Sequence, residues 1–257
     1  MDLKLKGKKA IVSGTGSQIG FGRGIALMLA QEGCDVACVD VDLGGAKKTA
    51  ADAKAPGHRT LALKVDITNR SDVDAAVKKI MAEFGRVDIL VNCAGRASGL
   101  RLFVQSTEEQ WDIDINVNLK GTMNFTQAVL PQMLAQGYGK IVNFSTHAAH
   151  QPTGLAGAAS YVAAKAGTVM FSKTLAGEVG YKGINVNIIA PGPGNTNFHK
   201  VSGNDPAMAG VVDSLAKAGK TATPEDIANA VAFLVSDVSS KLSGQIFEVS
   251  APMGPRN

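Results

Sequence analysis

The sequence predicts an α/β protein: a single-domain, doubly wound parallel sheet of about seven strands with helices on both faces. Short runs rich in Val and Ile recur along the chain and alternate with longer segments of helical apolar spacing. This alternation is typical of a parallel sheet that is covered on both sides. No repeat, composition shift or Pro/Gly/Ser-rich linker divides the 257 residues, so residues 1–257 are expected to form one domain.

The expected strands and helix ends follow from local patterns. Three helix starts place an acidic residue three positions after a capping hydroxyl, at 71–74, 106–109 and 223–226, and the last also has Pro224 at its first helical position. Gly33 and Gly85 are expected to end helices. The seven strands are expected at residues 9–13, 35–40, 60–66, 87–92, 140–145, 184–189 and 245–250. Sheets of this kind bind ligands at the carboxyl ends of their strands, where the functional residues are therefore expected.

Composition excludes several classes of protein. The net charge of +4 is mild and the basic residues are scattered, so no nucleic-acid partner is expected. No run of about 18 apolar residues occurs and the N-terminus has no apolar signal core, so neither a membrane span nor a leader is expected. Cys34, Cys38 and Cys93 are odd in number and lack the companions of a metal site, so no metal is expected. They are interpreted as reduced, buried thiols of a cytoplasmic protein.

A glycine-rich turn, "SGTGSQIGFGRG", follows the first expected strand and opens a helix. Backbone N–H groups at a helix N-terminus attract a pyrophosphate, and glycines let it approach closely. Asp40 ends the second expected strand, at the position from which an acid accepts hydrogen bonds from ribose hydroxyls and repels a 2′-phosphate. No Lys or Arg occurs in residues 14–22, so NAD is favoured over NADP. The alternative is that Asp40 only ends a strand as a turn residue.

The stretch "ASYVAAKAG" places Tyr161 and Lys165 four residues apart, on one face of a helix. An ammonium group beside a tyrosine stabilises the phenolate and is expected to lower its pKa from about 10. The pair therefore suits a general acid/base that moves a hydroxyl proton while a hydride moves to or from carbon.

Taken together, these motifs resemble the short-chain dehydrogenase/reductase (SDR) family, in its main branch with Tyr and Lys four apart. The family pattern TGxxxGxG matches residues 15–22, whereas strand register favours Gly14, Gly20 and Gly22 in a loop two residues longer. The resemblance implies a catalytic asparagine in "NVNLKG", where Asn118 is preferred to Asn116. It also implies further cofactor-binding residues in "KVDIT", "NCAG" and "PGPGNT": Asp66 and Ile67; Asn92, Ala94 and Gly95; Pro191, Gly192 and Thr196. Cys93 stands where the family usually has a second Asn.

Two adjacent hydroxyls, Ser145 and Thr146, compete for the role of the family's catalytic serine. The family spacing to the tyrosine is about 13 residues, and neither hydroxyl fits it because the intervening segment is longer here. Aligning from the strand "KIVNFST" favours Thr146, which offers the same hydroxyl as a serine. His147 and His150 follow. They either bind the substrate or are simply exposed in a loop, and the same two alternatives are open for Arg96 and Arg101.

The resemblance implies NAD-dependent interconversion of a secondary alcohol and a ketone, with Tyr161 as the acid/base. It also implies a substrate lid at about 197–222, which includes Gly203, Pro206, Gly210 and Gly219, and a homotetramer. The substrate would be a small-molecule alcohol or ketone. Two alternatives are an enoyl-thioester reductase of the same fold and a non-catalytic NAD-binding sensor or scaffold.

Overall fold

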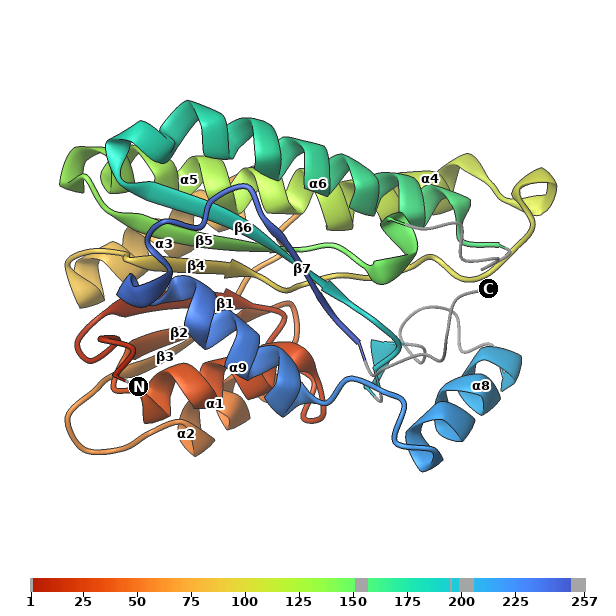
Figure 1. The fold of residues 1–257 in the computed structure, drawn as a ribbon, viewed down its shortest axis with the longest axis horizontal. Coiled ribbons are helices and arrows are strands. Elements are labelled where there is room, and N and C mark those ends of the chain that lie inside the picture. Colours follow the sequence, from red (N-terminus) through yellow and green to blue (C-terminus); the bar gives the residue numbers. More distant parts are fainter. Residues whose placement is uncertain (1, 151–156, 195, 199–205, 251–257) are drawn as a thin grey trace.

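The computed structural model describes residues 2–150, 157–194, 196–198 and 206–250. Its centre is a seven-stranded sheet in the order β3-β2-β1-β4-β5-β6-β7, in which all neighbouring strands are parallel (Figure 1). The strands are β1 (Lys9–Ser13), β2 (Asp35–Asp40), β3 (Thr60–Lys64), β4 (Ile89–Asn92), β5 (Gly139–Phe144), β6 (Ile184–Pro191) and β7 (Ile246–Val249). The order reverses between β1 and β4, so the predicted doubly wound sheet is confirmed.

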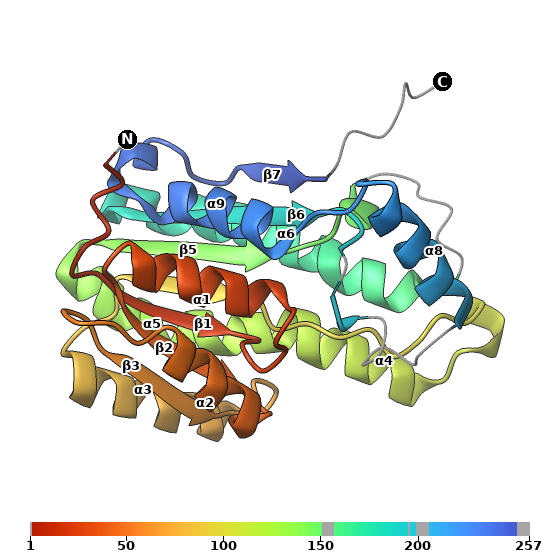
Figure 2. The ribbon, with the colours of Figure 1, turned by 90° about the horizontal axis from the view of Figure 1, so that it is seen from below.

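Helices cover both faces of this sheet. In Figure 1, α1, α2 and α9 lie below the sheet, and α5 and α6 lie above it. Figure 2, seen from below, shows α8 beyond the carboxyl ends of the strands. The helices are α1 (Phe21–Gln31), α2 (Leu43–Asp52), α3 (Arg70–Phe84), α4 (Glu108–Ile115), α5 (Gly121–Gln136), α6 (Ala159–Val179), α8 (Pro206–Lys217) and α9 (Pro224–Val235). A π-helical turn, Asn116–Lys120, joins α4 to α5.

Each face of the sheet has its own apolar core, as the alternation of side chains along a strand requires. Ala10 and Val12 of β1 belong to the core that also contains residues of α1, α2 and α9. Ile11, between them, belongs to the opposite core with residues of α3, α5 and α6. Because both faces are buried, β1 is apolar throughout its centre, which explains why the Val- and Ile-rich runs predicted strands correctly.

The strand boundaries differ from the predicted ones by up to two residues. The third strand ends at Lys64 rather than Asp66, and the fourth begins at Ile89 rather than Val87. Gly33 and Gly85 follow the ends of α1 and α3 with positive φ, as predicted.

Two of the three predicted helix starts were wrong by one or two residues. Helix α3 is capped by Asn69, whose side chain accepts from the amides of Ser71 and Asp72, so Ser71 lies inside the first turn. Helix α4 is capped by Thr107 with Gln110, not by Ser106. Only the cap of α9 stands as predicted, with reciprocal bonds between Thr223 and Asp226. Neighbouring polar residues compete for the same amides, and the tertiary path of the loop decides between them.

The described part of the chain contains no helix long and apolar enough to cross a membrane. Within the same residues, no cluster of His, Cys, Asp or Glu is arranged to hold a metal ion. The three cysteines are unpaired, and Cys34 and Cys38 are buried. Burial raises the pKa of each thiol to about 12, so none is a reactive thiolate.

Candidate active site

A cavity of about 1660 Å³, called the main cavity below, opens where the strands of the sheet end. Its walls come from the loops that follow β1, β2, β3, β4, β5 and β6 and from the start of α6. Most of the predicted site residues line it: Gly14, Gly20, Gly22, Asp40, Asp66, Ile67, Ala94, Gly95, Ser145, Thr146, Tyr161, Lys165, Pro191, Gly192 and Thr196. The volume exceeds that of an ordinary small-ligand site, so it has room for a dinucleotide together with a substrate.

The glycine loop is built on close backbone contacts. Gly14 has φ of +79°, and a Cβ there would lie 2.8 Å from the backbone of Ala94. A Cβ on Gly22 would collide with the carbonyl group of Gly14. Gly20 is the residue that caps α1. The positions that only glycine can fill therefore include both ends of the preferred set Gly14, Gly20 and Gly22.

Gly16, the first glycine of the alternative match at residues 15–22, joins the loop to Asp40. The amide of Gly16 donates to Oδ2 of Asp40 at 2.7 Å, and a Cβ on Gly16 would lie 2.8 Å from Cγ of Asp40. The amide of Asp42 donates to Oδ1 of the same carboxylate at 2.9 Å. The carboxylate is thus fixed beside the loop, at the edge of the main cavity, with lone pairs left for further donors. The signal for Gly16 was the second glycine of "SGTG".

The loop fits the phosphates and ribose of a dinucleotide. Ser17 Oγ and Gln18 Oε1 are buried, and neither has a hydrogen-bond partner in the described structure. Both residues line the main cavity. Buried polar atoms without protein partners are those that a ligand or water satisfies. Together with the free amides at the start of α1, they form a site of the kind that binds pyrophosphate.

The predicted cofactor-binding residues after β3 and at the end of β4 differ in their placement. Asp66 and Ile67 line the main cavity just after β3. Asn92 does not: it is 3% exposed, and its Nδ2 donates to Thr126 Oγ1 at 3.2 Å and to Asn143 Oδ1 at 2.8 Å. The side-chain amide of Asn92 therefore ties β4 to β5 and α5 and does not line the main cavity, and its contact with a cofactor stays a prediction.

Thr146 and Ser145 have different partners, although they are adjacent. The hydroxyl of Thr146 lies beside the side chain of Tyr161 and lowers the pKa of that tyrosine. Ser145 Oγ donates to the carbonyl oxygen of Lys165 at 3.2 Å, which ties the end of β5 to α6. Successive residues of an extended chain point to opposite sides, so only one of the two can face the tyrosine hydroxyl. Thr146 is the one that does.

Tyr161 and Lys165 lie at the centre of the main cavity wall. Burial raises the pKa of Tyr161, the Thr146 hydroxyl lowers it, and the charge of Asp114 raises it. Burial also lowers the pKa of Lys165 to about 8. The net shift of the Tyr161 pKa is therefore upward, opposite to the expected lowering, because burial is its largest cause and Lys165 is not among the groups that shift it. The ring of Phe198 lies 5.6 Å from that of Tyr161, centroid to centroid.

Lys165 and Asn118 meet beside Gly95. Lys165 Nζ donates to the carbonyl oxygen of Phe144 at 2.9 Å. A Cβ on Gly95 would lie 3.1 Å from Asn118 Oδ1 and 3.3 Å from Lys165 Nζ, so a larger residue would push these two groups apart. Asn118 is fully buried, and its Nδ2 donates to the carbonyl oxygens of Arg96 and Asp114. Asn118 thus supports the wall of the main cavity from behind rather than lining it.

Thr196, His147 and Arg96 also line the main cavity. Thr196 Oγ1 accepts from the amide of Phe198 at 3.2 Å. His147 lines the cavity, and its Nδ1 is 3.2 Å from Glu248 Oε2. Arg96 lines it as well, whereas His150 is not among its lining residues. Of the expected lid, Asn197, Phe198 and Val212 line the cavity; residues 199–205, including Gly203, lie outside the described residues.

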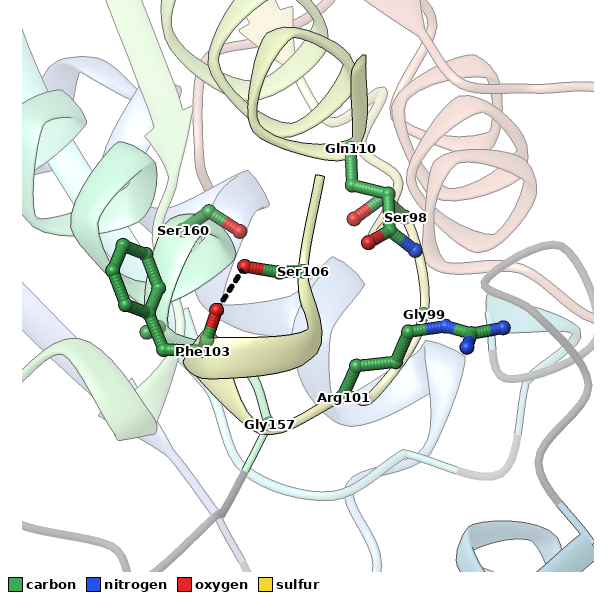
Figure 3. A pocket seen from close by; sticks show the side chains of 9 residues that line it. Ser98, Gly99, Arg101, Phe103, Ser106, Gln110, Gly157 and Ser160 are labelled. Atoms are coloured by element: carbon green, nitrogen blue, oxygen red, sulfur yellow. Dashed lines mark hydrogen bonds between the residues drawn. The ribbon is translucent and has the colours of Figure 1, made fainter. Parts of the chain in front are cut away.

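Arg101 lies elsewhere, beside a second, small pocket. This pocket is lined by the loop after β4, by the segment that leads into α4 and by the start of α6 (Figure 3). In it, Ser106 Oγ donates to the carbonyl oxygen of Phe103 at 2.7 Å. Ser98 and Ser160 lie on the wall of the same small pocket.

Three comparisons agree on the family. A family model described as enoyl-(acyl carrier protein) reductase matches residues 14–251. The chain is 41% identical over 238 residues to a subunit of a hydroxy(phenyl)methylsuccinyl-CoA dehydrogenase from Thauera aromatica, covering 91% of this chain and 92% of that one. It is 37% identical over 257 residues to a 3-oxoacyl-(acyl-carrier-protein) reductase of Staphylococcus aureus, covering 96% and 98%.

A solved structure extends the likeness to three dimensions. The 3-ketoacyl-(acyl-carrier-protein) reductase of Brucella melitensis, crystallised in complex with NADH, superimposes with a TM-score of 0.85 at 32% identity, covering 96% of this chain and 98% of that one. The fold, the arrangement of loops around the main cavity and the similar proteins lead to one conclusion. The chain belongs to the short-chain dehydrogenase/reductase family and is an oxidoreductase that takes a nicotinamide cofactor.

Proposed function

We propose that this protein interconverts a secondary alcohol and a ketone with NAD as cofactor. The observation that carries the proposal is that Thr146, Tyr161 and Lys165, four residues further along α6, line the same cavity as the glycine loop and Asp40, with Thr146 close enough to Tyr161 to lower its pKa. Bound NAD would supply the hydride acceptor at this site. The residues of the chain then hold the substrate oxygen and exchange its proton.

Thr146 and Tyr161 share the work at the substrate oxygen. Because its pKa is raised by burial, Tyr161 carries its proton at neutral pH and is ready to donate it to a ketone oxygen. Thr146, beside the tyrosine side chain, can bond the same substrate oxygen and keep it in line. In the direction of oxidation, Tyr161 must accept a proton, which positive charge nearby favours; Lys165 is the nearest cation on its own helix.

Asp40 supports NAD over NADP. It lies beside the glycine loop with Asp42, and both line the main cavity. Two carboxylates at this end repel a 2′-phosphate, and Asp40 can accept from ribose hydroxyls. Among the described residues that line the cavity, the Lys and Arg side chains are Lys165 and Arg96, and neither belongs to the glycine loop or to β2.

The proposed enzyme is a cytoplasmic homotetramer with a substrate lid at about 197–222. Exposed apolar side chains on three helices support a subunit contact: Ile115 on α4, Met123 on α5 and Met170 on α6. The placement of Phe198 against Tyr161 supports a lid that covers the reacting atoms.

Reduction of a carbon–carbon double bond in an enoyl thioester is the second candidate, favoured by the description of the matched family model. The names of the relatives favour thioester substrates for both candidates. A non-catalytic NAD-binding sensor or scaffold would have no use for Thr146 placed beside Tyr161.

The deciding experiment follows NADH at 340 nm with the purified protein. Formation is measured with secondary alcohols, including hydroxyacyl thioesters, and consumption with ketones and enoyl thioesters, each with NAD and NADP cofactors. Turnover of alcohols and ketones with NAD(H), reduced about a thousandfold in Tyr161→Phe while NADH still binds, is expected. Turnover of enoyl thioesters alone would establish the second candidate, and tight NADH binding without turnover would establish the third.

A further inference from the structure

A buried carboxylate that no sequence motif included lies close to the candidate active site. Asp114, on α4, is 1% exposed. Its Oδ1 accepts from the amide of Ser98 at 2.7 Å, and its Oδ2 accepts from Ser98 Oγ at 3.0 Å and from Ser160 Oγ at 2.6 Å. One side chain therefore joins three elements: α4, the loop after β4 and the first turn of α6.

The side chain of Asp114 contacts only hydrogen-bond donors. All three partners donate, and a carboxylate accepts without donating. Within the described residues, Asp114 forms no ion pair. A buried charge without a cation costs free energy, which only strong hydrogen bonds offset. The burial of the Asp114 carboxylate near the candidate active site therefore suggests a role beyond packing.

This role is indicated by the neighbours of Asp114. Ser160 immediately precedes Tyr161, and α6 begins at Ala159 without any side-chain cap of its own. The bond from Ser160 to Asp114 therefore anchors the turn that carries Tyr161. The backbone carbonyl oxygen of Asp114 also accepts from Asn118 Nδ2 at 2.8 Å. This bond links α4 to Asn118, the residue that lies beside Lys165.

We propose that Asp114 is a positioning residue that anchors the start of α6 through Ser160 and sets the pH at which Tyr161 exchanges its proton. The inference rests on the proposed function, because it assigns to Tyr161 the role of acid/base. Ser98 and Ser160, both on the wall of the small pocket, supply the two hydroxyls that donate to the carboxylate (Figure 3).

The expected effect of Asp114 on the pKa of Tyr161 follows from the negative charge of its carboxylate. Burial is the main reason that the pKa of Tyr161 is raised, and the negative charge of Asp114 raises it further. Several other charged or titratable groups line the same cavity: Lys165 on α6, Arg96 after β4, His147 after β5, and Glu109 and Asp112 on α4. Removing the charge of Asp114 leaves these in place, so the phenolate of Tyr161 becomes easier to form and the tyrosine titrates at lower pH.

The test compares Asp114→Asn, which removes the charge and keeps the shape, with Ser160→Ala, which removes the bond and keeps the charge. The chain has three tyrosines, so protein labelled with ¹³C at tyrosine Cζ gives a simple spectrum, and Tyr161→Phe assigns its resonance. Each protein is titrated without cofactor and with NAD⁺. The pH profile of turnover is recorded alongside, with the best substrate found.

Asp114→Asn is expected to move the Tyr161 titration to lower pH by about half a pH unit or more, whereas Ser160→Ala leaves it unmoved. Superimposable curves for wild type and Asp114→Asn, up to the highest pH at which both stay folded, would overturn the proposal. A lower melting temperature with no change in the titration would give Asp114 a structural role alone. Should Asp114→Asn not fold, Asp114→Ser supplies the same comparison. The spectrum does not require turnover, so failure of the proposed function is detected separately.

Discussion

The two ends of the main cavity are shaped by different parts of the chain: backbone at one end and side chains at the other. At the end formed by β1 and β2, the geometry is set by backbone: Gly14 against Ala94, Gly22 against Gly14, and the Gly16 amide on Asp40. At the end formed by β5 and α6, it is set by side chains: Thr146 beside Tyr161, and Lys165 bonded to the carbonyl oxygen of Phe144.

The difference reflects what each end must do. A phosphate is recognised through N–H groups at short range, and glycines on the loop let it approach them closely. A proton, by contrast, moves between groups whose pKa values are tuned by burial and charge, and only side chains provide these. Substitutions at the first end are therefore expected to act on cofactor binding, and substitutions at the second on the rate of the chemical step.

Gly22→Ala should have the largest effect at the backbone end. Its methyl group would collide with the carbonyl group of Gly14, which is main chain and cannot rotate away. We expect a loss of NADH affinity of about a hundredfold and of about 1–3 kcal/mol in the free energy of unfolding. Fluorescence titration with NADH and chemical denaturation measure these.

Gly20→Ala is the matched control for that substitution. The nearest atom to its added Cβ is the Cβ of Ser17, at 2.9 Å, on a short side chain and not on the main chain. A milder effect is expected there. Equal affinity for NADH in Gly22→Ala and the wild type would mean that the backbone contacts are not what shapes this end.

Thr146→Ala and Ser145→Ala test the side-chain end. Thr146 lies beside the Tyr161 side chain, so Thr146→Ala should lower kcat about a hundredfold, while Thr146→Ser retains most of it. Ser145→Ala loses only a bond to the carbonyl oxygen of Lys165 and should cost about 1 kcal/mol of stability with turnover nearly unchanged. A greater loss of turnover in Ser145→Ala would reverse the assignment of the two hydroxyls.

Asp40→Asn should change the choice of cofactor more than the rate. The amide can still accept from Gly16 N–H, but the charge that opposes a 2′-phosphate is gone. We expect the ratio of kcat/KM with NAD to that with NADP to fall by about tenfold, or about 1.4 kcal/mol. An unchanged ratio would place the discrimination outside Asp40.

Lys165→Met should stabilise the cofactor-free protein while abolishing turnover. The pKa of Lys165 is lowered by burial to about 8, below that of the unfolded chain. Between pH 8 and about 10.5 the unfolded state therefore binds more protons, so wild-type stability rises with pH across this range. The variant should be more stable by roughly 1–3 kcal/mol at pH 7, and this advantage should shrink by pH 10.

Denaturation of both proteins at the two pH values is the measurement. If the variant is more stable than the wild type by the same amount at pH 7 and pH 10, burial of the Lys165 ammonium does not destabilise the folded protein.

The sequence alone predicted the sheet and most of the cavity lining, and the reason is local. Runs such as "KAIVS" are apolar because both faces of β1 are buried, and Gly20 and Gly22 of "SGTGSQIGFG" are required by contacts with nearby residues of the same segment. The family resemblance added the residues after the later strands. Helix caps were less predictable, since Asn69 and Ser71, or Ser106 and Thr107, offer similar oxygens within two residues.

Tertiary structure alone decided which polar side chain faces which group. It turned Asn92 into the space between β4, β5 and α5, and Thr146 rather than Ser145 towards Tyr161. It also buried Asp114 against Ser98 and Ser160, which are 16 and 46 residues away along the chain. Hydrogen bonds of this range leave no periodic trace in a sequence, because they depend on the packing of elements and not on the pattern within any one of them.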